Sequence, residues 1–129
     1  MQRNHDDRPP IYDLSVRALA AELVGIFDLR ECRYEPFPFD AQLPRVEPGR
    51  IVLPAAEPGV IPWQLDRAVE LPVCAEGLTL GRFVLVPRSP TCGVSLSPRG
   101  RTIAITLAER LAPLIAGAIL ADERASERA

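Results

Sequence analysis

The sequence predicts a single α+β domain in which a small sheet is combined with a helix at each end. Residues 69–87 contain two apolar runs joined by a Glu-Gly turn, which is the pattern of a β-hairpin. Apolar residues recur at helical spacing near the start of the chain and again toward its end. A length of 129 residues suits one hydrophobic core.

The first element expected is a helix over residues 14–27. It follows a polar leader at residues 1–12 that contains Pro9 and Pro10, and Asp13 is suited to cap its N-terminus. The helix is expected to end by Asp28. One face is apolar and contains Val16, Leu19, Ala20, Leu23, Ile26 and Phe27.

Short strands are expected after this helix. Residues 31–37 alternate in polarity and predict a first strand, ended by Pro36 and Pro38. Pro44 and Pro48 predict a turn over residues 39–48 without regular pairing, and residues 50–53 predict a second short strand. Residues 54–62 are expected to form a loop, and residues 63–67 one helical turn or a short edge strand.

The hairpin at residues 69–87 is expected to be the centre of the sheet. In its second run, Phe83 and Leu85 alternate with Val84 and Val86, so both faces are largely apolar. A strand that is apolar on both faces is normally covered on both faces. Helices or loops are therefore expected above and below the hairpin, and residues 88–96 are expected to form the next loop.

A long helix is expected from Ser97 and Pro98, which are suited to the N-cap and to the first helical position. It extends to about residue 127, with a kink near Glu109 caused by Pro113. Residues 122–129 are charged and form a solvated end or the start of a linker.

This last helix carries two apolar stripes. One contains Ile103, Leu107, Leu111, Leu114 and Ala118, and the other contains Ala104, Ala108, Ala112, Ile115 and Ile119. A helix that packs on one sheet face needs an apolar stripe of only about 100°. The surplus is expected to contact either the first helix or a second copy of the chain. The dimer-interface candidates are Leu111, Leu114, Ile115, Ala118 and Ile119.

The order of these elements resembles the GAF domain family, in particular the reduced GAF-like modules of bacterial sensor and signalling proteins. The likeness covers about residues 14–120, within an expected GAF-like domain at residues 13–121. Three segments carry it: the opening helix through Leu19-Ala20-Ala21-Glu22-Leu23 into residues 29–35, the hairpin with Val69-Glu70-Leu71-Pro72-Val73 and residues 81–87, and the closing helix at 103–120.

The resemblance implies an antiparallel β-sheet with the N- and C-terminal helices packed on one face. It also implies a non-enzymatic sensory or regulatory role, with dimerisation through the terminal helices and an effector domain or signalling protein as partner. The stretch between Leu53 and Val69 is shorter than in ligand-binding members, and the Asn-Lys-Phe-Asp-Glu pattern of the cyclic-nucleotide branch is absent. Binding of cyclic nucleotides is therefore not expected.

The ligand-pocket candidates are Phe37, Phe39, Trp63 and Arg82, for a small molecule of unknown identity. The three aromatic rings could line an apolar pocket on the loop face of the sheet. Arg82 could receive an anion there, although a surface arginine usually has no such specific role. Alternatively, Trp63 plugs the sheet edge and the pocket is vestigial. The protein would then be a scaffold for dimerisation and protein interaction.

The cysteines provide the main enzymatic alternative. Cys32, Cys74 and Cys92 form no CxxC pair or disulfide framework. Cys32 and Cys74 are expected to be buried in strands, whereas Cys92 is expected in an exposed loop. Some GAF-fold enzymes reduce free methionine sulfoxide with two cysteines, but the spacing here does not match that branch.

Other classes of function are not expected. The only histidine, His5, lies in the leader, so neither a haem ligand nor a catalytic dyad is indicated. We expect no metal and no cofactor. A net charge of −2 argues against nucleic-acid binding. No apolar run approaches the ~20 residues of a membrane span, and the start shows no signal-peptide pattern, so a cytoplasmic protein without a membrane segment is expected.

Overall fold

The computed structural model of the chain describes residues 13–53, 64–65, 67–88 and 94–128. The predicted leader at 1–12 and the predicted loop at 54–62 lie outside this range. The described part contains two helices and seven strands, which confirms the α+β class. In chain order the elements are α1 (Asp13–Phe27), β1 (Leu29–Pro36), β2 (Arg45–Glu47), β3 (Arg50–Val52), β4 (Gln64–Leu65), β5 (Val69–Ala75), β6 (Leu78–Pro87), β7 (Val94–Ser95) and α2 (Pro98–Arg128).

The main sheet has five strands in the order β1-β6-β5-β2-β3, and β4 pairs separately with β7. All pairs in the main sheet are antiparallel except β2 with β5, which are parallel at Arg45 and Glu70. The sheet is therefore mixed, and the expectation of an antiparallel sheet was wrong at this pair. The reason is topological. Because β1 and β5 both run antiparallel to β6, a β2 that is parallel to β5 is also parallel to β1. Such an arrangement requires a crossover between β1 and β2.

The central hairpin is confirmed. β5 and β6 pair along their length and are joined by Glu76 and Gly77, whose φ angles are 52° and 79°. Two successive positive φ values define a type I′ turn, which matches the twist of the flanking strands. Glycine at the second turn position removes the steric cost of a Cβ in this conformation.

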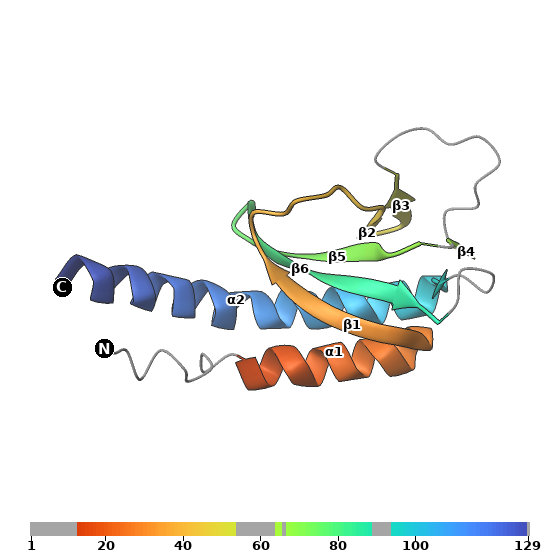
Figure 1. Cartoon of the computed structure of the whole chain (residues 1–129), viewed down its shortest axis with the longest axis horizontal. Coiled ribbons are helices and arrows are strands. Elements are labelled where there is room, and N and C mark those ends of the chain that lie inside the picture. The colour runs from red at the N-terminus through yellow and green to blue at the C-terminus, as the bar shows by residue number, and fades with distance from the viewer. Residues whose placement is uncertain (1–12, 54–63, 66, 89–93, 129) are drawn as a thin grey trace.

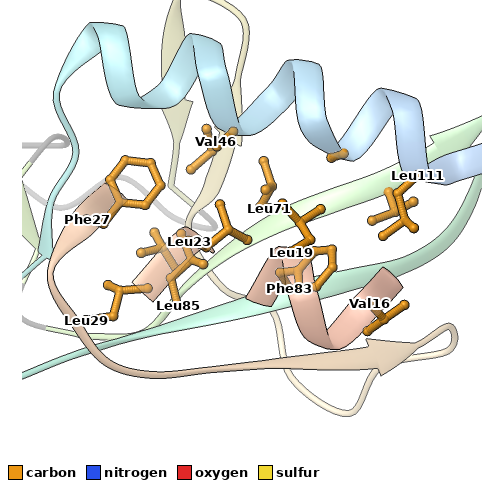
Figure 2. Close-up of a cluster of buried hydrophobic side chains, with 14 of the residues drawn as sticks. Val16, Leu19, Leu23, Phe27, Leu29, Val46, Leu71, Phe83, Leu85 and Leu111 are labelled. Carbon is orange, nitrogen blue, oxygen red and sulfur yellow. The ribbon is translucent and has the colours of Figure 1, made fainter. Parts of the chain in front are cut away.

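Both helices cover the same face of the sheet and run in opposite directions (Figure 1). α1 packs mainly against β1, α2 mainly against β5, and the two helices contact each other. Figure 2 shows side chains from α1, α2 and the strands meeting in one core between these layers. Its fully buried members include Leu23, Leu71, Phe83 and Leu85.

α2 begins as the sequence predicts. The backbone N–H of Gly100 donates to the Ser97 side-chain oxygen at 3.1 Å, which is the expected N-cap bond. The helix continues through Pro113 to Arg128, and its C-terminal part extends past the sheet (Figure 1). The side chains that it buries are Ala104, Ala108, Leu111, Ala112 and Ile115.

The strands differ from expectation at two places where proline and glycine predict loops. Pro44 and Pro48 flank β2 rather than interrupt it, so both leave its three residues free to pair with β3. β7 likewise forms within the predicted loop at 88–96, and β4 shows that the segment after residue 63 includes a short strand rather than a helical turn.

Candidate functional site

The crossover between β1 and β2, residues 37–44, is a strap that crosses the outer face of the sheet, opposite the helices (Figure 1). Its ends are fixed by backbone hydrogen bonds. The N–H of Phe37 donates to the Leu80 carbonyl at 3.1 Å, and the N–H of Glu70 donates to the Pro44 carbonyl at 2.8 Å. The strap therefore has a defined path between these two points.

The buried guanidinium of Arg82 fixes the middle of the strap. It reaches the outer face from β6 because it alternates with the core residues Phe83 and Leu85. Its Nη1 donates to the Ala41 carbonyl at 2.8 Å, and its carbon Cζ lies 4.2 Å from the centre of the Phe39 ring. This hydrogen bond and the cation–π contact both attach the strap to the sheet.

Two carboxylates balance the charge of Arg82. Its Nη1 donates to Glu70 Oε1 at 2.7 Å, and its Nη2 and Nε donate to Glu35 Oε1 at 2.8 and 3.0 Å. The side chain of Arg82 is only 4% exposed. A guanidinium that is buried to this degree needs such partners, since an unpaired charge inside a protein is costly.

The pKa values reflect this arrangement. Hydrogen bonding from Arg82 is the main reason that the pKa of Glu35 lies below its usual value. Burial alone would lower the pKa of Arg82, but hydrogen bonds to Glu70 and Glu35 outweigh burial and raise it. The guanidinium therefore stays charged and directed at these two carboxylates.

A second ion-paired group lies where β2 turns into β3. The side chain of Glu47 accepts from Arg45 Nε at 2.6 Å and from Arg50 Nε at 3.1 Å. Burial would raise the pKa of Glu47, but these two hydrogen bonds outweigh it and lower the pKa. Glu47 and its two arginines therefore stabilise the β2–β3 corner.

An open groove of about 1020 Å³ lies between these two groups. It follows the side of β5 on which β2 pairs, with the strap on one wall and α2 on the other. Its lining includes Phe37, Phe39, Asp40, Arg45, Glu47, Glu70, Leu71, Pro72, Cys74, Arg82, Ile105, Ala108 and Glu109. A largely preformed concave site with apolar walls and a few polar groups is the usual form of a ligand-binding site.

Three of the four predicted pocket residues meet at this groove. The rings of Phe37 and Phe39 pack edge to face with centroids 5.4 Å apart, and Phe39 packs on Arg82. Phe37 is 59% exposed. Trp63 lies outside the described residues, so its role as a lining or a plug stays a prediction. Because Arg82 is already engaged by two carboxylates, the structure gives it a structural role rather than that of an anion receptor.

Sequence reasoning missed the partners of Arg82 and the wall that α2 contributes. The register that the Glu-Gly turn alone would set puts Glu70 and Arg82 on opposite faces. A register shift between Val73 and Cys74 brings Glu70 diagonally across from Arg82 on the same face, and the sequence does not mark this shift. Glu35 and Glu109 depend on strand order and helix placement, and nothing in the sequence alone marks them.

The dimer candidates fall on different sides of α2. Leu111 and Ile115 are 5% and 1% exposed and belong to the core of the single chain. Leu114 and Ile119 are 54% and 36% exposed, and Ala118 is half-buried. Only the last three therefore offer surface to a second copy.

The cysteines also separate. Cys32 is half-buried, and burial raises the pKa of its thiol to about 12. Cys74 is exposed and lines the groove, with its Sγ 3.8 Å from Thr79 Oγ1, so the expectation that it is buried was wrong. It points to the outer face with Glu70 and Pro72. Cys92 lies outside the described residues. Across residues 13–53, 64–65, 67–88 and 94–128, no group of three or more His, Cys, Asp or Glu could hold a metal ion.

One described helix is long and apolar enough, by length and composition, to cross a membrane. It is the stretch Pro98–Ser126 of α2. The sequence had predicted no such segment. The same helix supplies Ala104, Ala108 and Ile115 to the core, and helices that pack in a protein core pass the same test. Membrane insertion therefore gains little support from this result.

Comparison with protein-family models, with curated proteins and with solved structures gave no match for this chain.

Proposed function

We propose that this protein is a non-enzymatic regulatory domain that recognises a ligand in the groove between the strap, β5 and α2. The observation that carries the proposal is the groove itself, whose outer wall is locked in place by the buried Arg82. A wall that is fixed before binding reduces the entropy cost of holding a ligand. The donors of Arg82 are directed at Glu35, Glu70 and Ala41, which supports a shaping role rather than a chemical one.

A GAF-like assignment is part of this proposal. It is supported by the two terminal helices on one sheet face and by the central hairpin (Figure 1). The parallel pairing of β2 with β5 departs from the antiparallel sheet that the resemblance implies.

We also propose that the protein forms a homodimer through the outward side of its helices. The support is the exposed apolar surface of α2, where Ile103, Leu114 and Leu120 are 40%, 54% and 48% exposed. Leu14 of α1 is 74% exposed. A scaffold that dimerises in this way without using the groove is the second candidate function.

Ligand binding is tested by comparing freshly purified protein with protein that has been unfolded in urea, dialysed and refolded. A ligand that binds only the folded state raises the unfolding temperature, so wild type should lose stability when it is stripped. Cys74→Trp places a large ring at an exposed groove position and should remove the difference. Equal unfolding temperatures for fresh and stripped wild type, with or without added metabolite extract, would favour the scaffold.

A further inference from the structure

We infer that the groove takes an extended peptide segment, which adds as a strand to the unpaired part of β5 and carries a basic side chain. This inference rests on the proposed function and names the class of ligand. It is drawn from the backbone of β5 and from the charges on the groove walls.

The first observation is that β2 covers only the start of β5. The two strands pair at Arg45 and Glu70 alone, and no other described strand lies on that side of β5. The N–H of Glu70 points to this side, since it donates to Pro44. Strand alternation then directs the carbonyl of Pro72 and both the N–H and carbonyl of Cys74 into the groove.

These backbone groups are what an added strand requires. A peptide that lies antiparallel beside Cys74 would exchange two hydrogen bonds with it and donate a third to the Pro72 carbonyl. Pro72 has no N–H, so it leaves no unpaired donor at this edge. A strand tolerates proline where its missing N–H would face away from the neighbouring strand.

The second observation concerns the groove walls. On the α2 side, the half-buried Ile105 provides apolar surface beside the buried Ala108, and the exposed Phe37 does so on the strap side. An extended peptide presents alternate side chains to these two walls. Apolar side chains of the peptide therefore fit against both the α2 wall and the strap wall of the groove.

The third observation is the charge of the lining. Four acidic residues line the groove against two arginines, and both arginines are paired with glutamates. Asp40 and Glu109 are exposed, and neither makes an ion pair within the described part of the chain. Charge complementarity therefore favours a basic side chain beside Glu109.

A fluorescein-labelled hexapeptide of alternating valine and arginine tests the inference, with a valine–glutamate hexapeptide as its counterpart. Fluorescence anisotropy should show the arginine probe binding at least roughly tenfold more tightly to the wild type. In ¹⁵N-labelled protein, the amide of Cys74 should shift on binding and become protected from hydrogen exchange. An arginine probe with methylated backbone nitrogens should lose most of this affinity.

Two matched pairs of variants locate the site. Glu109→Arg should reverse the preference between the probes, and Glu22→Arg on the exposed side of α1 should not reverse it. Both variants change the net charge equally, so only a charge at the groove can account for a difference between them. Cys74→Pro removes the groove-facing N–H without touching the ladder to β6 and should abolish binding, while Cys74→Ser should retain it. A folded Cys74→Pro that binds normally would overturn strand addition.

The two proposals fail separately. If wild type binds neither peptide but loses stability on stripping, the peptide class is wrong and ligand recognition stands. If the arginine probe binds equally to wild type and Glu109→Arg, the interaction is non-specific attraction to an acidic protein and the inference fails. If Cys74→Trp leaves peptide binding intact, the groove is not the site.

Discussion

Arg82 joins three segments that are distant in the chain. It contacts β1 through Glu35, β5 through Glu70 and the strap through Ala41, and it does so with its side chain only 4% exposed. The shape of the groove therefore depends on one buried cation and its partners.

Replacing Arg82 tests this dependence. Arg82→Met should lower the free energy of unfolding by about 3–5 kcal/mol, because it leaves Glu70 buried without its partner. Arg33→Met on neighbouring β1 removes an arginine that is 52% exposed and should change stability by no more than about 0.5 kcal/mol. Urea denaturation of both variants provides the measurement. Equal effects would show that the Arg82 cluster contributes nothing special.

Glu35 predicts a dependence of stability on pH. Its pKa is depressed in the folded protein, mainly by the hydrogen bond from Arg82, relative to an unfolded value near 4.5. The folded state therefore binds this proton less readily than the unfolded state, and the stabilisation is present above pH 4.5 and lost as pH falls through the folded pKa. Denaturation curves between neutral and acidic pH should show a shallower loss in Glu35→Gln than in wild type. Parallel losses would contradict the assignment.

The sequence singled out Arg82, Phe37 and Phe39 as pocket candidates but did not show that two glutamates neutralise the charge of Arg82. An arginine on a strand with an apolar surrounding has the same sequence appearance whether its charge is free or neutralised. The register of β1 and β5 against β6 determines that this charge is neutralised, because it brings Glu35 and Glu70 to the same guanidinium.

Among the elements, the hairpin turn was the most predictable, and it allows a matched glycine test. Gly77→Ala should destabilise the protein by about 1 kcal/mol, because its φ of 79° is costly for a residue with a Cβ. Gly25→Ala in α1 should instead stabilise it by about 0.5–1 kcal/mol, since a Cβ there meets nothing within 4 Å. Thermal unfolding of both variants should show shifts of opposite sign.

The two stripes of α2 were visible in the sequence, but not which of them faces the sheet. The structure buries the stripe with three alanines, since small side chains let the helix approach the sheet closely, and leaves Ile103 and Leu114 exposed. Periodicity gives the angle between the stripes and does not give the orientation of the helix. Leu111 is buried with the alanine stripe, because it lies on the border between the two.

Glutamate scanning of α2 checks this orientation. Ile115→Glu places a charge in the core and should unfold the protein or cost several kcal/mol, whereas Leu114→Glu should fold normally. Circular dichroism with urea denaturation distinguishes the two variants. Unfolding caused by Leu114→Glu would mean that this position also belongs to the core.

At the scale of the whole molecule, we propose that association uses the helical side and that recognition uses the groove. The prediction is that Leu114→Glu shifts the protein from dimer to monomer in sedimentation velocity. Leu78→Glu is the control, because it makes the same change at a residue that is 68% exposed on the hairpin, away from the helices. A wild type that is monomeric at all concentrations would refute the dimer.

Ligand recognition is the central claim, and native mass spectrometry of freshly purified protein tests it most directly. The mass under native conditions is compared with the denatured mass, for wild type and for Cys74→Trp. We predict extra non-covalent mass on wild type that is absent from the variant. A wild type at its sequence mass, both when fresh and after incubation with an extract of its expression host, would contradict ligand recognition and leave a dimerising scaffold.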